Sequence, residues 1–282
     1  MPETEDSKGK MGLLTGKTSI GNDVPCSNNP FFMRPPIYTT RLCPLLLSSF
    51  FLLAGCRKEK IFLNPDGTPY KIQQITVVSS FADVPPDTYY FTYNSFGEPL
   101  TVKHAEPGTG HPNAAFLYDQ YHRFIGFVRP YDNGFYETYS KFFYNDCNQI
   151  AGDSNYVFGP YIDSIPGIMP QYGGSVTLYK YDDLGRIIQT SFAFFGQPPT
   201  IETYTYDRFG DQVLGGMVYD NRVSYLRTNA VWMFLDNNYS VHNPFKADSY
   251  NAYGLPTVFE GENPLGQIIV ATGKFTITYA RR

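Results

Sequence analysis

The stretch that decides the fold is residues 179–189, which read Y-K-Y-D-D-L-G-R-I-I-Q. Alternating side chains lead into a Tyr-Asp pair, and two isoleucines follow the glycine, so the pattern predicts two strands joined by a tight turn. Asp182 stands at the first turn position, where its carboxylate can accept backbone N–H groups further round the turn. Gly185 stands where the turn needs a positive φ, which glycine adopts without a Cβ clash. The stretch is therefore expected to be a β-hairpin.

The same device recurs along the chain in six Tyr-Asp or Tyr-Asn pairs. The third residue after each Asp or Asn is Gly, Asn or His, the types found most often with positive φ. Pair by pair, the expected turn residues are Asn94 and Gly97, Asp119 and His122, Asn145 and Asn148, Asp182 and Gly185, Asp207 and Gly210, and Asn251 and Gly254. No segment shows a sustained 3.6-residue period. The sequence thus predicts an all-β fold of consecutive antiparallel β-hairpins, forming one long curved sheet or an open barrel with little helix.

Residues 181–187, Y-D-D-L-G-R-I, are similar to the YD-repeat signature of Rhs-type proteins. The other copies keep only the tyrosine, the Asp or Asn and the turn residue, and the resemblance covers roughly residues 89 to 260. The chain also resembles Bacteroidetes lipoproteins of unknown function that are built from degenerate hairpins. The resemblance implies a hairpin fold and carries over no catalytic residue. In the divergent stretch 221–246, Asp236-Asn237-Asn238 is interpreted as another hairpin turn that has lost its tyrosine.

The N-terminal part has the pattern of a lipoprotein leader. Arg34 and Arg41 precede a short apolar run at residues 42–53, and Leu-Ala-Gly-Cys at 53–56 leads into a charged burst. The run is too short to span a membrane and is typical of a signal peptide, although a buried core helix is the alternative. By resemblance to bacterial lipoproteins, Cys56 is the expected lipidation site. The predicted organisation is a mis-called, disordered upstream extension at 1–32, a signal peptide at 33–55, a lipid-anchored tether at 56–70 and a β-hairpin repeat domain at 71–282.

Charge and cysteine content limit the possible partners and the cell compartment of the protein. From Cys56 onward the chain carries 17 Lys and Arg against 22 Asp and Glu, and this mildly acidic balance argues against nucleic acid as a partner. The expected location is the cell envelope, with a lipid anchor in the outer membrane. Once the leader is removed and Cys56 is lipidated, Cys147 has no cysteine to pair with, so we expect an unpaired thiol. A nucleophilic role for Cys147 would need a positioned base, which the pattern does not provide.

Metal and catalytic sites are weakly indicated, and we expect no cofactor. Oxygen-rich turns suit calcium, which would make Asp182, Asp183, Asp207 and Asp211 candidate ligands. His104, Glu106 and His111 share a Gly/Pro-rich loop and are an alternative metal site. The turn rule explains the repeated Asp and Asn residues without a metal. No Ser/His/Asp arrangement and no pair of acids suited to glycoside hydrolysis stands out.

Aromatic residues make up 17% of the chain, and most of them are expected to pack across strands. Variable segments on a rigid scaffold tend to carry recognition, so the aromatics in such segments are the candidate ligand-binding residues: Trp232, Tyr156, Tyr161 and Tyr172. The sequence predicts a non-enzymatic envelope lipoprotein that binds a glycan or a protein partner through its loops. The alternatives are a structural, shell-type element without a small ligand and, as a minor one, a polysaccharide hydrolase.

Overall fold

The computed structural model describes residues 68–169 and 174–282, and these form one antiparallel sheet of 14 strands. In these ranges the helical elements with assigned bounds are a 3₁₀ turn, η4 (Tyr225–Thr228), and one α-helix, α1 (Ala230–Leu235). The strands are β1 (Tyr70–Ser79), β2 (Asp87–Tyr93), β3 (Pro99–Lys103), β4 (Ala114–Tyr118), β5 (Phe124–Pro130), β6 (Phe135–Tyr144), β7 (Ile150–Ile162), β8 (Ile165–Pro166), β9 (Gly174–Tyr181), β10 (Ile187–Phe194), β11 (Thr200–Thr203), β12 (Ser249–Tyr250), β13 (Pro256–Glu262) and β14 (Thr272–Arg281).

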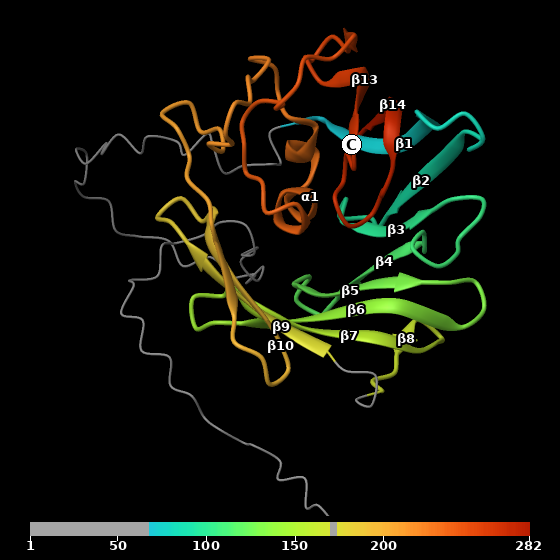
Figure 1. Ribbon diagram of the computed structural model, residues 1–282, viewed down its shortest axis with the longest axis vertical. Coiled ribbons are helices and arrows are strands. Elements are labelled where there is room, and N and C mark those ends of the chain that lie inside the picture. Colours follow the sequence, from blue (N-terminus) through green and yellow to red (C-terminus); the bar gives the residue numbers. More distant parts are fainter. Residues whose placement is uncertain (1–67, 170–173) are drawn as a thin grey trace, which may run out of the picture.

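The strand order is β11-β10-β9-β7-β6-β5-β4-β3-β2-β1-β14-β13-β12, with β8 paired to β7. From β1 to β7 and from β9 to β11, sheet neighbours follow one another along the chain, and β8 lies between β7 and β9 in sequence. β14 returns to pair with β1 and places Ile277 opposite Ile75. The sheet bends around α1, which lies inside the curve (Figure 1). The prediction of one long, open, curved sheet of antiparallel hairpins is confirmed.

The six Tyr-Asp and Tyr-Asn turns share one geometry. In every copy the Oδ1 atom of the Asp or Asn accepts two backbone N–H groups, two and four residues further on, at 2.8–3.0 Å. The third residue after it has φ between 57° and 89°, whether it is Gly, His or Asn. Its N–H donates back to the carbonyl of the first turn residue at 2.9–3.1 Å. These hydrogen bonds lie within the turn, and the turn geometry fixes the pairing register of the strands on either side.

In four of the six pairs the tyrosine links its hairpin to the strand beside it. Its hydroxyl donates to the first or a near-first carbonyl of the neighbouring strand, and Tyr279 of β14 makes the same contact. The four pair-derived bonds are Tyr93 to Ile72, Tyr144 to Phe124, Tyr181 to Ile150 and Tyr206 to Ile187, and Tyr279 bonds Pro256, all at 2.7–3.2 Å. The other two pairs differ. The Tyr250 hydroxyl donates to Oδ2 of Asp220 at 2.8 Å, and the Tyr118 hydroxyl is buried without a hydrogen-bond partner among the described residues. The aromatic at this position therefore packs and also stitches strands together.

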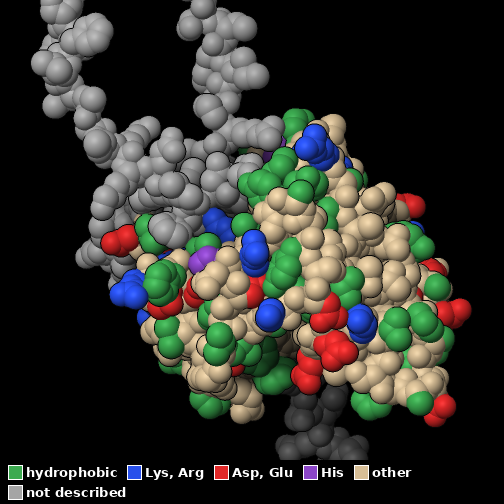
Figure 2. All heavy atoms as spheres, turned by 90° about the horizontal axis from the view of Figure 1, so that it is seen from above, with side chains coloured by type: hydrophobic (Ala, Val, Ile, Leu, Met, Phe, Trp, Pro, Cys, Tyr) green, Lys and Arg blue, Asp and Glu red, His purple; other side chains and the backbone are tan. Residues whose placement is uncertain are grey.

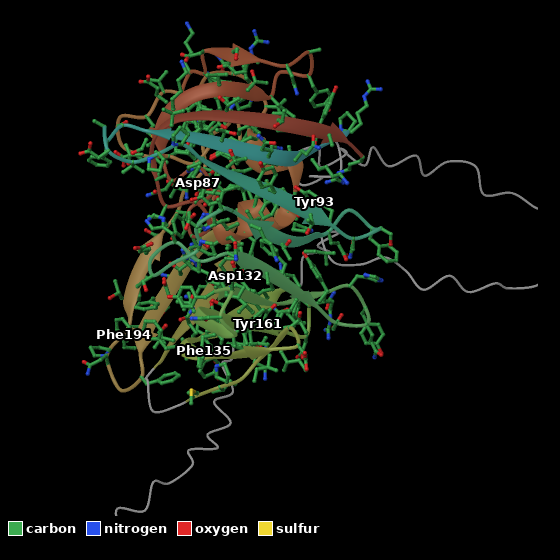
Figure 3. All side chains as sticks on the ribbon, turned by 90° about the vertical axis from the view of Figure 1, so that its right-hand side faces the viewer. Asp87, Tyr93, Asp132, Phe135, Tyr161 and Phe194 are labelled. Carbon is green, nitrogen blue, oxygen red and sulfur yellow. The ribbon has the colours of Figure 1, made fainter. Side chains whose placement is uncertain are left out.

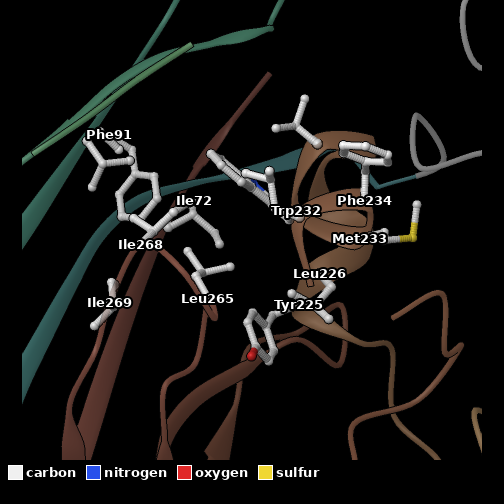
Figure 4. Packing of buried hydrophobic residues seen from close by; sticks show 14 of the residues in the cluster. Ile72, Phe91, Tyr225, Leu226, Trp232, Met233, Phe234, Leu265, Ile268 and Ile269 are labelled. Carbon is white, nitrogen blue, oxygen red and sulfur yellow. The ribbon is translucent and has the colours of Figure 1, made fainter. Parts of the chain in front are cut away.

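The main core fills the inside of the curve, and Trp232 on α1 is at its centre. This side chain is only 1% exposed, and its ring meets those of Phe91 and Phe116 edge-on at 5.7 and 5.4 Å. Figure 4 shows Trp232 pointing from α1 toward Ile72 and Phe91. The prediction that Trp232 is an exposed binding residue is wrong, because the segment that carries it closes the concave side of the sheet. Asp236 ends α1 instead of opening a hairpin turn, and Asn237 beyond it has φ 49°.

Several predictions fall on residues outside the described ranges: the segments 1–32 and 33–55, Cys56 and most of the tether, and Tyr172. Among the described residues, no helix is long and apolar enough to cross a membrane. Cys147 is disulfide-bonded, so the expectation of an unpaired thiol is wrong. Over the face in Figure 2, basic and acidic side chains are interspersed.

Candidate ligand-binding groove

A groove of about 480 Å³ lies on the concave face where the sheet continues past α1. Its floor comes from β6, β7, β9, β10 and β11, and one end is closed by the last residues of α1 and the turn after it. The lining residues are Ser140, Phe142, Asp153, Asn155, Ser175, Thr177, Tyr179, Thr190, Phe192, Phe194, Thr200, Glu202, Phe234, Leu235, Asn237 and Gln267. This volume is within the range of small-ligand sites in proteins, about 300–1,000 Å³.

Strand register brings these side chains together. Residues at every second position of a strand point to the same face, and the pairing aligns those positions in rows across the sheet. One row joins Phe142, Asp153, Thr177, Phe192 and Thr200 across five strands. The row beside it joins Tyr179, Thr190 and Glu202. The floor of the groove is therefore built on strands.

Asp153 is the buried charge of the groove, with 4% of its surface exposed. The Tyr179 hydroxyl donates to its Oδ2 at 2.6 Å, and the Thr177 hydroxyl lies 3.5 Å from Oδ1. Desolvation raises the pKa of Asp153 above its ordinary value, although the two hydroxyls oppose this shift. The Tyr179 ring packs on Phe234 of α1 at 5.2 Å, so the helix fixes the side chain that holds the carboxylate.

Glu202 lies on the exposed edge strand at the opposite side of the groove. Its Oε2 accepts a hydrogen bond from the Tyr204 hydroxyl at 2.8 Å, and Thr190 is 3.3 Å from the same hydroxyl. Beside α1, burial raises the pKa of Asp236 to about 7. The residues that line the groove include two carboxylates and neither Lys nor Arg, so the groove disfavours anionic ligands.

Two phenylalanines form an exposed aromatic wall at the end of β10. Phe192 and Phe194 are 37% and 62% exposed, and their rings meet edge-to-face at 5.0 Å. Figure 3 shows Phe194 on the outer part of the strand, far from the Tyr93 end of the sheet. Large apolar side chains that stay exposed beside convergent polar groups are typical of a binding surface.

The structure brings none of the described candidate aromatics into this groove. Tyr156 and Tyr161 are half-buried and pack against a second, smaller cluster of Ala115, Val128, Tyr136 and Tyr139. Residues missed by the sequence analysis, such as Asp153, Thr177 and Phe192, belong to ordinary alternating strands. Their only sequence signal is polar side chains at alternate positions on neighbouring strands, and it has meaning only once the pairing is known.

Three of the candidate metal ligands, Asp182, Asp211 and His104, are already bonded to protein groups. Asp182 accepts two backbone N–H groups and the Arg186 guanidinium, and both oxygens of Asp211 accept from His242. His104 uses Nδ1 for Asp87 and Nε2 for the carbonyl of His111, at 2.7 and 2.9 Å. In the described part of the chain, no cluster of three or more His, Cys, Asp or Glu residues is arranged to hold a metal ion.

Comparisons with known proteins give little beyond the fold. No family model matches the chain, and no curated protein matches it. Among solved structures, the chain is similar to part of a TcdB2-TccC3-Cdc42 crystal structure, at 16% identity and a TM-score of 0.19. The chain is also similar to a TcdB2-TccC3 structure without its hypervariable C-terminal region, at 15% identity and a TM-score of 0.19. Each likeness covers 56% of this chain and 8% of the other. Scores this low carry no argument about function. The fold and groove define an all-β protein with an open candidate binding site.

Proposed function

We propose that this chain is a lipid-anchored envelope protein that binds a neutral glycan in the concave groove without chemical turnover. The observation that carries the proposal is the lining of the groove. Hydroxyl, amide and carboxylate side chains of Asp153, Asn155 and Thr177 converge beside the exposed rings of Phe192 and Phe194. Sugars present hydroxyl groups for the former and apolar C–H faces for the latter.

The absence of Lys and Arg from the lining specifies the class of glycan. An anionic sugar would bring its charge toward Asp153 and Glu202 with no cation in the groove to offset it. A neutral sugar pays no such cost, and its hydroxyls can donate to both carboxylates. The lipid anchor rests on the leader-like pattern that ends at Cys56.

The two acids of the lining come from different strands. Asp153 is on β7 and Glu202 on β11, three strand spacings apart in the sheet, which puts their backbones roughly 14 Å apart. Asp153 accepts from Tyr179 and Glu202 from Tyr204, so we assign both acids to ligand binding. A shell-type structural role would leave the polar rows and the aromatic wall without a purpose, so it takes second place.

The test is thermal unfolding of the full chain against matched panels of neutral and acidic oligosaccharides. A neutral ligand at 100 times its Kd should stabilise the folded state by about 2.7 kcal/mol, a rise in Tm of roughly 5–10 °C for a domain of this size. Phe194→Ala and Asp153→Asn should abolish the shift. Phe209→Ala is the matched control, because Phe209 is 54% exposed and outside the groove. Equal loss in Phe194→Ala and Phe209→Ala, or no shift with any neutral glycan, would refute the proposal.

A further inference from the structure

The sheet ends at β11, and the side of this strand away from β10 is open. All four residues, Thr200–Thr203, are exposed. The Tyr204 N–H donates to the Ile188 carbonyl at 2.8 Å, so the backbone groups of Tyr204 face β10. Successive residues of an antiparallel strand direct these groups to opposite sides. The N–H and C=O groups of Ile201 and Thr203 therefore point away from the sheet.

The chain itself begins to cover this edge and then leaves it. Val213 donates its N–H to the carbonyl of Thr205 at 2.8 Å, and Tyr206 pairs with Gln212. Beyond Val213 the chain turns away through Leu214 and Gly216, whose φ is 78°. A fully formed hairpin would have continued alongside Thr203 and Ile201. There is thus space for one further strand next to the groove, and the N–H and C=O groups of Ile201 and Thr203 point toward that space.

We propose that this open edge of β11 binds an extended segment of a partner protein as an added antiparallel strand, with basic side chains facing the groove. Exposed edges recruit strands through main-chain hydrogen bonds. On the concave face an added strand lies beside Thr200 and Glu202, so its alternate side chains meet an acidic surface that contains no Lys or Arg. Lysine or arginine at those positions is complementary to Glu202, the carboxylate of the neighbouring strand. On the other face, the neighbour is Ile201, which is 57% exposed, and this favours an apolar residue.

A second copy of the chain fits this edge poorly. The register that pairs Ile201 with Thr203 sets Glu202 opposite its own copy, and like charges directly opposite each other are destabilising. With Ile201 opposite itself, Thr203 meets Pro199, which has no N–H to donate. With Thr203 opposite itself, Ile201 meets Thr205, whose carbonyl already accepts the N–H of Val213. The partner is therefore a different polypeptide with alternating basic and apolar residues.

The experiment measures fluorescence anisotropy of a labelled eight-residue Val-Lys alternating peptide with the full chain. Saturable binding is expected, and a Val-Glu peptide should not bind. Thr203→Pro removes one outward N–H while leaving the bonds to β10, because proline is tolerated where an edge N–H faces solvent. Thr203→Pro should weaken peptide binding at least about tenfold, because one hydrogen bond between uncharged groups is lost and the proline ring occupies the place of the N–H. Thr203→Ala, which keeps the N–H, should stay within about twofold of the parent.

A second measurement does not depend on how Thr203→Pro folds. The Val-Lys peptide N-methylated at alternate residues loses its own donors to the edge and should not bind, whereas the parent peptide should slow hydrogen exchange at Ile201 and Thr203. No saturable binding, equal binding of both peptides, or equal affinity in Thr203→Pro and Thr203→Ala would overturn the proposal, and so would a dimer formed through β11. Asp153→Asn and Phe194→Ala test the glycan site separately, since neither changes the backbone of β11.

Discussion

Replacing Tyr181 by Phe removes one hydroxyl from the device that repeats through the sheet. This hydroxyl donates to the carbonyl of Ile150 at 2.8 Å, and burial raises the pKa of Tyr181 well above its ordinary value. The variant loses the bond and leaves a carbonyl with one partner fewer away from water, which costs about 1–3 kcal/mol. The chain contains its own control. The hydroxyl of Tyr118 is buried with no partner among the described residues, so Tyr118→Phe removes a desolvated group and no hydrogen bond.

The assay is thermal and urea unfolding of the two variants beside the parent. For a domain of 150–250 residues, 1 kcal/mol corresponds to about 2–4 °C in Tm, so Tyr181→Phe should lower Tm by roughly 2–10 °C. Tyr118→Phe should leave Tm unchanged or raise it, because the unpaired hydroxyl only costs desolvation energy in the folded state. If both variants lose the same stability, the tyrosines act through packing alone, and the hydrogen-bonding role of the repeat is refuted.

Two more predictions concern alkaline pH and the anchor. Burial raises the pKa of Tyr89 and of Tyr131 to about 12. These folded-state values lie above the unfolded value of about 10. The contribution of the two tyrosines to folding stability is therefore complete below pH 10 and is lost as the pH rises from 10 to 12. Urea unfolding across that window should show falling stability, and tyrosinate absorbance should appear at higher pH in the folded than in the unfolded chain; coincident titrations would contradict this. For the anchor, Cys56→Ala should release the protein from the membrane fraction, and a variant that stays in that fraction would disprove lipidation at Cys56.

The hairpins could be predicted from the sequence because their determinants are local. A side chain that accepts N–H groups two and four residues away, and a residue that tolerates positive φ, act within five positions of each other. That is why His122 and Asn148 could be placed beside the glycines, and why the curved antiparallel sheet followed. The pairing of β14 with β1 has no local signal, because it joins residues about 200 positions apart, as in Ile75 with Ile277.

The segment around Trp232 shows where the local rule ends. Six residues of α1 are too few to show a helical period, and the apolar run A-V-W-M-F-L is equally compatible with a strand. Its conformation follows from the curvature of the sheet, which offers a concave apolar surface to fill. The groove could not be predicted from the sequence for a related reason. Asp153, Thr177 and Thr190 come from three strands, and only the register reveals that they share one face.

The contrast between the two halves of the concave face is the strongest reason to regard the groove as functional. From β1 to β6 the inward positions are apolar, as at Phe91, Phe116 and Phe142, and the segment with α1 covers them. From β7 to β11 the inward positions include the polar residues Asp153, Thr177 and Glu202, and the end of α1 with the turn after it lines only one side of this part. Packing explains the first half. It does not explain the second, where a carboxylate is held almost fully desolvated beside exposed aromatic rings at a cost in stability. A ligand that donates to Asp153 and covers Phe192 and Phe194 would offset that cost, and the groove has the volume to hold one.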